Sequence, residues 1–165
     1  MFRKSLGITV FLWVFFIFPL SASMVSFMVI ETGLHPESHG GNYSTVWEDA
    51  LMGVFFDEGF IVSNSPVMRM NRFPEDVLPQ EIQGDFFDAY RGGAEFFILV
   101  LLEFVAQGGL IRPHGALVRV LRTGEHTGDL IYEQHIPAGT GTGIRDEFIR
   151  AQETGKILAA HIKDR

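Results

Sequence analysis

Apolar runs separated by turn residues predict the strands of a β-sheet. The run at 24–32 ends in Glu31-Thr32-Gly33, the pattern of a strand followed by a turn. The run at 96–105 is apolar at both alternating positions, as expected of a central strand that is covered on both faces. Shorter runs predict three further strands, at 60–63, 116–122 and 129–136.

Apolar residues three and four positions apart predict helices between these strands. The first helix is expected to open at Thr45, because Glu48 three residues later would complete a capping box, and to end at Gly59. The second is expected to start at Pro79, which suits the first turn of a helix, and to stop at Gly92. Each of these helices joins one predicted strand to the next.

A third helix is predicted over 144–163. Its apolar residues fall on one stripe: Ile144, Phe148, Ala151, Leu158 and Ile162. Gly155 lies on the same stripe, and a residue without a side chain at that position would let the helix approach its neighbour closely.

The predicted elements follow one another in the order β-α-β-α-β-β-β-α. The stretch 67–78 is expected to be irregular, because its apolar residues follow no period. A helix that joins two strands of one sheet forms a right-handed crossover, so the first three strands are expected to be parallel. The last two strands are expected to add as antiparallel hairpins. The sequence therefore predicts a single α/β domain with a mixed sheet.

The first 23 residues have the order of an export signal. Arg3 and Lys4 are basic, 6–20 is almost wholly apolar, and Ser21-Ala22-Ser23 supplies the small residues that a signal peptidase recognises. We therefore expect a signal peptide at 1–23 and a mature domain at 24–165 that is periplasmic or secreted. The alternative is that the segment is kept as an anchor, but its apolar run is shorter than the ~20 residues that a membrane-spanning helix needs.

Composition narrows the classes of partner. Without the signal the chain has 142 residues (165 minus 23), with 11 basic and 20 acidic side chains and a net charge of −9. An acidic surface repels nucleic acid, and no basic run offsets it, so we expect no nucleic-acid partner. Cysteine is absent, which excludes disulfides and the lipid-bearing cysteine of a lipoprotein. No second apolar run is long enough to span a membrane once the signal is removed.

Several stretches resemble a group of periplasmic modules. These are the helix-to-strand step at 47–62, the approach to the central strand at 89–97, and the hairpin at 117–121 and 127–131. The first reads Trp-Glu-Asp-Ala-Leu and then Phe-Phe-Asp-Glu-Gly-Phe-Ile-Val, and the second reads Ala-Tyr-Arg-Gly-Gly-Ala-Glu-Phe-Phe. The group includes the curli-secretion lipoprotein, the outer-membrane activator of penicillin-binding proteins and the amino-terminal domain of TolB. The resemblance implies a non-enzymatic interaction module of the cell envelope, although the lipid-anchoring cysteine of several members is missing.

Candidate contact residues lie where the predicted parallel strands end. Open α/β sheets bind ligands outside the carboxyl ends of their strands. There the fold would gather Glu31, His35, His39, Ser63 and Asn64 as contacts for a ligand or partner. The two histidines are four residues apart, a spacing that a helix would align for metal binding, but the proline and glycines around them predict a loop. We therefore expect no metal ion there.

The sequence contains no catalytic motif of the common nucleophilic classes. Neither a G-x-S-x-G elbow nor a Ser-x-x-Lys pair is present, and there is no cysteine. The Gly-Thr repeat at 139–143 precedes a helix but does not match the nucleotide-binding fingerprints, so it predicts a flexible connection. Glu103 lies within an apolar strand and is expected to be exposed at its end rather than buried. We therefore expect no catalytic residue and no cofactor.

Two hypotheses about function follow. The leading one is an envelope module that binds a protein partner through a sheet edge or its helix faces, without catalysis. The alternative is a small periplasmic ligand-binding protein or hydrolase with its site at the carboxyl ends of the parallel strands. A pocket lined by the candidate residues would favour the alternative, whereas an exposed apolar surface would favour the first.

Overall fold

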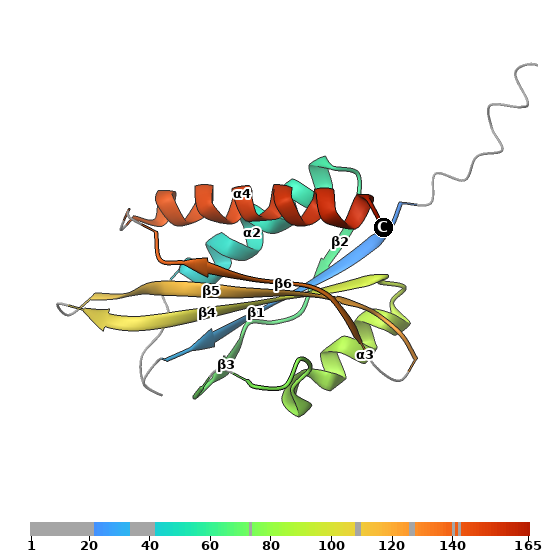
Figure 1. Cartoon of the computed structure of the whole chain (residues 1–165), viewed down its shortest axis with the longest axis horizontal. Helices are drawn as coiled ribbons and strands as arrows, with labels where there is room; N and C mark the ends of the chain where they lie inside the picture. The colour runs from blue at the N-terminus through green and yellow to red at the C-terminus, as the bar shows by residue number, and fades with distance from the viewer. Residues whose placement is uncertain are drawn as a thin grey trace, which may run out of the picture.

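A mixed β-sheet lies between two layers of helices (Figure 1). The computed structural model describes residues 22–33, 42–72, 74–107, 110–125, 128–139, 141 and 143–165. Helices α2 (Tyr43–Asp57) and α4 (Ile144–Lys163) cover one face of the sheet, here called the upper face. Helix α3 (Gln83–Arg91), which follows the short 3-10 helix η1 (Gln80–Ile82), covers the lower face. The prediction of a single α/β domain with a mixed sheet is confirmed.

The sheet is built around its first strand. Within the described residues it contains β1 (Met24–Thr32), β2 (Ile61–Asn64), β3 (Met68–Met70), β4 (Phe96–Gln107), β5 (Leu110–Arg122) and β6 (Asp129–Pro137). The order across the sheet is β2-β1-β4-β5-β6, and β3 also pairs with β1. β2, β3 and β4 run parallel to β1, whereas β5 is antiparallel to both β4 and β6.

β2 and β3 together form one edge of the sheet in two pieces. β2 pairs with the first four residues of β1, and β3 pairs with Ile30, Glu31 and Thr32 at its end. The expectation that 67–78 is irregular is therefore wrong for Met68–Met70. Three residues are too few to show a period in the sequence, and their side chains divide between the two faces.

Side chains from both faces of β1 fill two hydrophobic cores. Phe27 and Val29 pack with Trp47 and Phe55 of α2 and with Leu158 of α4 in the upper core. On the other face, the lower core contains residues of β1, β4, β5, η1 and α3: Met28, Ile30, Phe97, Leu99, Leu101, Leu117, Leu121, Ile82 and Phe86. Every residue of β1 from the second onward is buried. The two apolar faces of β4 were predicted, and Ile98 and Leu99 are both fully buried.

The predicted capping box at Thr45 is wrong. α2 begins at Tyr43, and its N-cap residue Asn42 makes no side-chain capping hydrogen bond. Ser44, inside the first turn, donates instead to the carboxylate of Glu31, and Glu48 accepts a hydrogen bond from Asn64. Partners from distant strands thus replace the local cap.

The predicted bounds of α4 are confirmed, and its apolar stripe is confirmed in part. Ala151, Leu158 and Ile162 are buried, whereas Ile144 and Phe148 in the first turns are 46% and 37% exposed. The predicted second strand is displaced by one residue, since β2 begins at Ile61 rather than at residue 60.

Gly155 lies at the closest approach of α4 to α2. A Cβ atom at this position would be 3.2 Å from Cβ of Val54 and 3.3 Å from Cδ2 of Leu51. These distances are shorter than ordinary van der Waals contact, so the predicted close approach is confirmed. The absence of a side chain at Gly155 allows the two helices of the upper layer to touch.

We expect Gly155→Leu to destabilise the fold by about 1–3 kcal/mol, because the added side chain overpacks this contact. Gly155→Ala should be nearly neutral, since a gain of up to about 1 kcal/mol in helix propensity is offset by crowding. Gly53→Ala in α2 is the matched control, because nothing lies within 4 Å of a Cβ atom there. Gly53→Ala should therefore be stabilised by most of the ~1 kcal/mol by which alanine exceeds glycine in helix propensity. Urea unfolding measures all three, and a stabilised Gly155→Leu variant would contradict the packing of α4 on α2.

Candidate functional site

Glu31 is a buried carboxylate at the end of β1 with both oxygen atoms occupied. Ser44 Oγ of α2 donates to Oε1 over 2.6 Å, and Arg69 Nε of β3 donates to Oε2 over 2.8 Å. The Glu31 side chain is 4% exposed and that of Arg69 is 46% exposed. A buried carboxylate is costly unless it is paired and hydrogen-bonded, and here both conditions are met. Glu31 therefore joins β1, α2 and β3.

The other predicted contact residues do not converge on Glu31. Asn64 pairs with Phe27, four residues before Glu31, which corresponds to about 13 Å along the strand. Its side-chain amide donates to Glu48 over 2.6 Å. Ser63 precedes Asn64 and so points to the opposite face of the sheet. His35 and His39 lie outside the described residues. The predicted cluster is therefore not formed by Glu31, Ser63 and Asn64.

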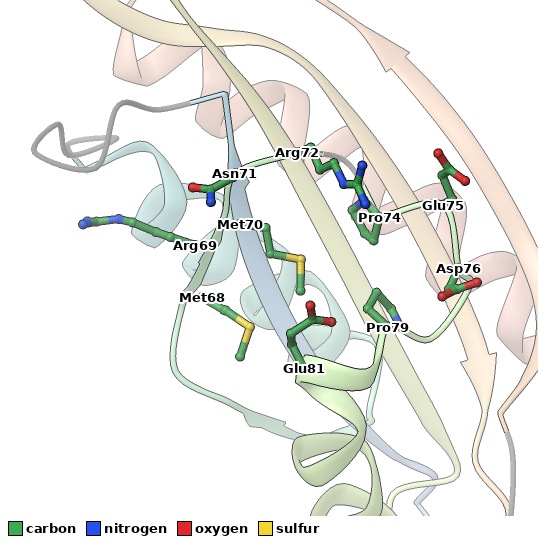
Figure 2. Close-up of a pocket in the computed structure, with 10 residues that line it drawn as sticks. All are labelled: Met68, Arg69, Met70, Asn71, Arg72, Pro74, Glu75, Asp76, Pro79 and Glu81. Atoms are coloured by element: carbon green, nitrogen blue, oxygen red, sulfur yellow. The ribbon is translucent and has the colours of Figure 1, made fainter.

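An open cavity of about 470 Å³ nevertheless lies at the carboxyl end of β3 (Figure 2). Met68 and Met70 point into it, close to Glu81, whereas Arg69 points away toward the upper face. Pro74, Glu75, Asp76 and Pro79 complete most of its wall. The position fits the rule for open α/β sheets, but the lining residues come from the stretch that was expected to be irregular.

A buried arginine holds the loop that forms this wall. Arg119 of β5 donates from Nη1 to the carbonyl oxygen of Asp76 over 2.7 Å and from Nε to Glu133 of β6 over 2.7 Å. Its side chain is 8% exposed. Two charge-assisted contacts from a buried guanidinium thus fix the loop against the lower face of the sheet.

A second buried polar cluster lies between the helices of the upper layer. Trp47 Nε1 donates to Oε2 of Glu147 over 2.9 Å, and Arg150 Nη2 donates to the same oxygen over 2.6 Å. Arg150 Nη1 also donates to the carbonyl oxygen of Pro137, at the end of β6. These contacts tie α2, α4 and β6 together, so we assign the cluster a structural role.

A third region contains two histidines and a carboxylate. Glu103, His114 and His135 line a shallow cavity of about 590 Å³ beside the bulge in the β4–β5 pairing. Glu103 is exposed, as predicted, but it lies beside the bulge within β4 rather than at the end of the strand. Across the described residues, no group of three or more His, Asp or Glu side chains is placed to hold a metal ion. Nor is any helix in this part of the chain long and apolar enough to cross a membrane.

Comparison with known proteins identifies a similar fold. The PelC dodecamer from Paraburkholderia phytofirmans superposes with a TM-score of 0.50 at 10% identity, over 85% of this chain and 87% of that one. The hypothetical protein CT253 from Chlamydia trachomatis gives 0.45 at 13% identity, covering 86% and 96% of the two chains. A putative neuraminyllactose-binding hemagglutinin homolog from Helicobacter pylori gives 0.45 at 12% identity, covering 89% of each. No protein-family model and no curated protein matches the sequence.

These comparisons bear on the fold and not on the site. At 10% identity the likeness to PelC shows a shared arrangement of helices and strands only, and the two lower scores support no argument. The resemblance to the curli-secretion, penicillin-binding-protein-activator and TolB modules stays a prediction.

Sequence reasoning missed Arg69, Arg119 and Glu147, which make the buried polar contacts. Arg69 contacts a residue 38 positions away and Glu147 one that is 100 positions away. No local pattern signals such pairs. One signal was present for Arg119, since a charged residue within the apolar strand 116–121 must find a partner if the strand is buried.

We expect Arg69→Met to lower the free energy of unfolding by about 1–3 kcal/mol, because it leaves one oxygen of buried Glu31 without a donor. Arg91→Met is the matched control, since Arg91 pairs with Asp88 at the surface, where the two side chains are 75% and 79% exposed. That change should cost less than about 0.5 kcal/mol. Urea unfolding of both variants gives the comparison. If both substitutions lower the free energy of unfolding by the same small amount, Arg69 does not stabilise buried Glu31.

Proposed function

We propose that the chain is an exported, non-enzymatic interaction module of the cell envelope that binds a protein partner through the edge formed by β2 and β3. The observation that carries this proposal is the exposure of large apolar side chains beside that edge, on both faces of the sheet. Phe56 of α2 is 69% exposed and Ile61 of β2 is 53% exposed, the two highest values among the large hydrophobic residues described. Val67, just before β3, is 38% exposed.

The backbone of this edge supports the same surface. β2 and β3 pair with β1 on one side, and no other described strand pairs with them on the other. Both are short, so backbone pairing alone would add little to affinity. Side chains must supply most of the binding energy, and burying a phenylalanine or isoleucine contributes roughly 1.5–3 kcal/mol each.

The opposite edge fits a partner less well. β6 carries a bulge where its pairing with β5 shifts between Val120 and Leu121, and bulges at an edge work against further strand pairing. Leu130 is its one large hydrophobic side chain among those described as exposed.

The polar residues support a module without catalysis. The candidate polar side chains already have hydrogen-bond partners inside the protein. Glu31 accepts from Ser44 and Arg69, and Asn64 donates to Glu48. Glu147 accepts from Trp47 and Arg150. No described serine lies in a hydrogen bond with a histidine, the arrangement that nucleophilic catalysis would need.

A second copy of this chain is one protein partner that the proposal includes. The similar fold of PelC is found in a dodecamer. An edge surface that meets a different surface of the next copy would build a ring if the rotation closes. Light scattering on the mature domain separates self-association from binding to another envelope protein.

A second candidate function is supported by the cavity beside β3. Its volume of about 470 Å³ lies within the range of small-ligand sites. Arg69 forms an ion pair with Glu31. The remaining charged residues of the lining are one cation, Arg72, and three anions, Glu75, Asp76 and Glu81, and two methionine side chains lie beside them. That lining suits a small amphipathic cation, and native mass spectrometry of protein isolated from the envelope would detect one.

We expect a photo-crosslinking amino acid at position 61 to give a defined adduct in the envelope, and the same residue at position 157 to give none. Ile157 is the matched control, because it is 50% exposed and belongs to α4 rather than to the β2–β3 edge. Combining Phe56→Ser with the crosslinker at position 61 should reduce the yield of the adduct about tenfold or more, since the exposed aromatic side chain of Phe56 would anchor the interface. Adducts at 157 but not at 61 would contradict the proposed surface, and a ligand without any adduct would favour the second candidate.

A further inference from the structure

The bond at which the predicted signal would be removed lies where the chain enters β1, at the start of the sheet. The carbonyl oxygen of Ser23 accepts a hydrogen bond from the backbone N–H of Ile61 over 3.0 Å. Ser23 Oγ donates to the carboxylate of Glu95 over 3.0 Å, and the carbonyl oxygen of Met24 accepts from the N–H of Glu95 over 2.8 Å. Groups on both sides of the Ser23–Met24 bond are therefore held, by the first residue of β2 and by Glu95 just before β4.

The residues that follow this bond are even less accessible. β1 runs between β2 and β3 on one side and β4 on the other, and all of its residues from Val25 to Thr32 are buried. A peptidase that binds its substrate as an extended segment needs free backbone donors and acceptors. β1 pairs with β4 along one side and with β2 and β3 at all but two residues of the other, so it offers little free edge.

The few residues that precede the bond leave little space for a membrane-bound peptidase between the apolar segment and the folded domain. The apolar run ends at Leu20, three residues before Ser23, and three extended residues span at most about 11 Å. A peptidase acting at the membrane would have to work within that distance of the folded domain.

We infer that the signal segment is removed before β1 enters the sheet, and that a chain which folds uncut becomes resistant to signal peptidase and stays attached to the membrane. The inference rests on the export signal of the proposed function. The reaction is hydrolysis of the Ser23–Met24 peptide bond: water adds a hydroxyl group to the Ser23 carbonyl carbon, and the freed amine of Met24 takes up a proton.

The strand register determines how long the Ser23–Met24 bond stays accessible during export. β1 pairs with residues 61–64 of β2 and with residues 96–103 of β4. Its final environment cannot form until the chain has been exported to about residue 103. Pairing of segments so far apart is slow compared with local structure, so processing has an interval in which the bond is free.

The test compares three signal-bearing chains in detergent micelles with purified signal peptidase. The first is the folded uncut protein. The second carries ten Gly and Ser residues inserted between Ser23 and Met24, which places the bond outside the ladder and leaves β1 intact. The third is Leu99→Pro, in which proline removes a ladder hydrogen bond from the centre of β4, so that the sheet does not form.

We expect the folded uncut protein to be cleaved about 100-fold or more slowly than the other two, because proteolysis then follows the small population of opened molecules. Circular dichroism confirms which samples are folded. Cleavage of the folded protein at a rate within a few-fold of the spacer variant would overturn the inference, as would failure of all three chains to be cut. Adducts at position 61 are measured independently, so the proposed interaction surface can survive either result.

Discussion

The burial of β1 on both faces and along both edges is the constraint on which the rest of the structure depends. A strand in this position needs a partner strand on each side and an apolar layer above and below. The chain supplies β4 on one side and divides the other side between β2 and β3. α2 and α4 close the upper face, and their contact is possible because Gly155 brings no side chain between them.

The same constraint explains the polar residues. Burial of β1 extends to Glu31 and Thr32, so their side chains must be satisfied inside the protein. Thr32 donates to the carbonyl oxygen of Leu102, and Glu31 accepts from Ser44 and Arg69. A carboxylate that looked like a candidate contact for a ligand is thus a structural element that fixes the start of α2 and the position of β3.

The features that the sequence predicts well are those with a long, regular pattern. The bounds of α4 and the double-sided burial of β4 follow from many residues that obey one period. β3 has only three residues and shows no period. The predicted cap of Thr45 with Glu48 misplaced the start of α2, because the helix already begins at Tyr43 and Glu48 accepts a hydrogen bond from Asn64 of β2 instead. Tertiary contacts took precedence over local capping chemistry at that end of the helix.

The position of the candidate site stays a prediction, and the side chains that line the observed cavity are not the predicted ones. The rule for open α/β sheets places a site at the carboxyl ends of the strands, and the described cavity lies at the end of one of them, β3, beside Met68 and Met70. The side chains that line the cavity depend on the path of the chain from β3 to η1. Arg119 of β5 fixes this path by its hydrogen bond to Asp76, which lies 43 residues earlier in the sequence. Single-sequence patterns carry no information on a contact of that kind.

The strength of β1 is measured most directly by native-state hydrogen exchange on the domain from Met24 onward. If β1 is the central constraint, its amides from Val25 to Thr32 exchange only with the free energy of global unfolding, together with those of β4, while β6 amides exchange through smaller openings. Amides of Val25 to Phe27 that exchange as fast as those of β6 would show that the first strand frays at its start. That result would contradict the account of the fold and of the protected Ser23–Met24 bond alike.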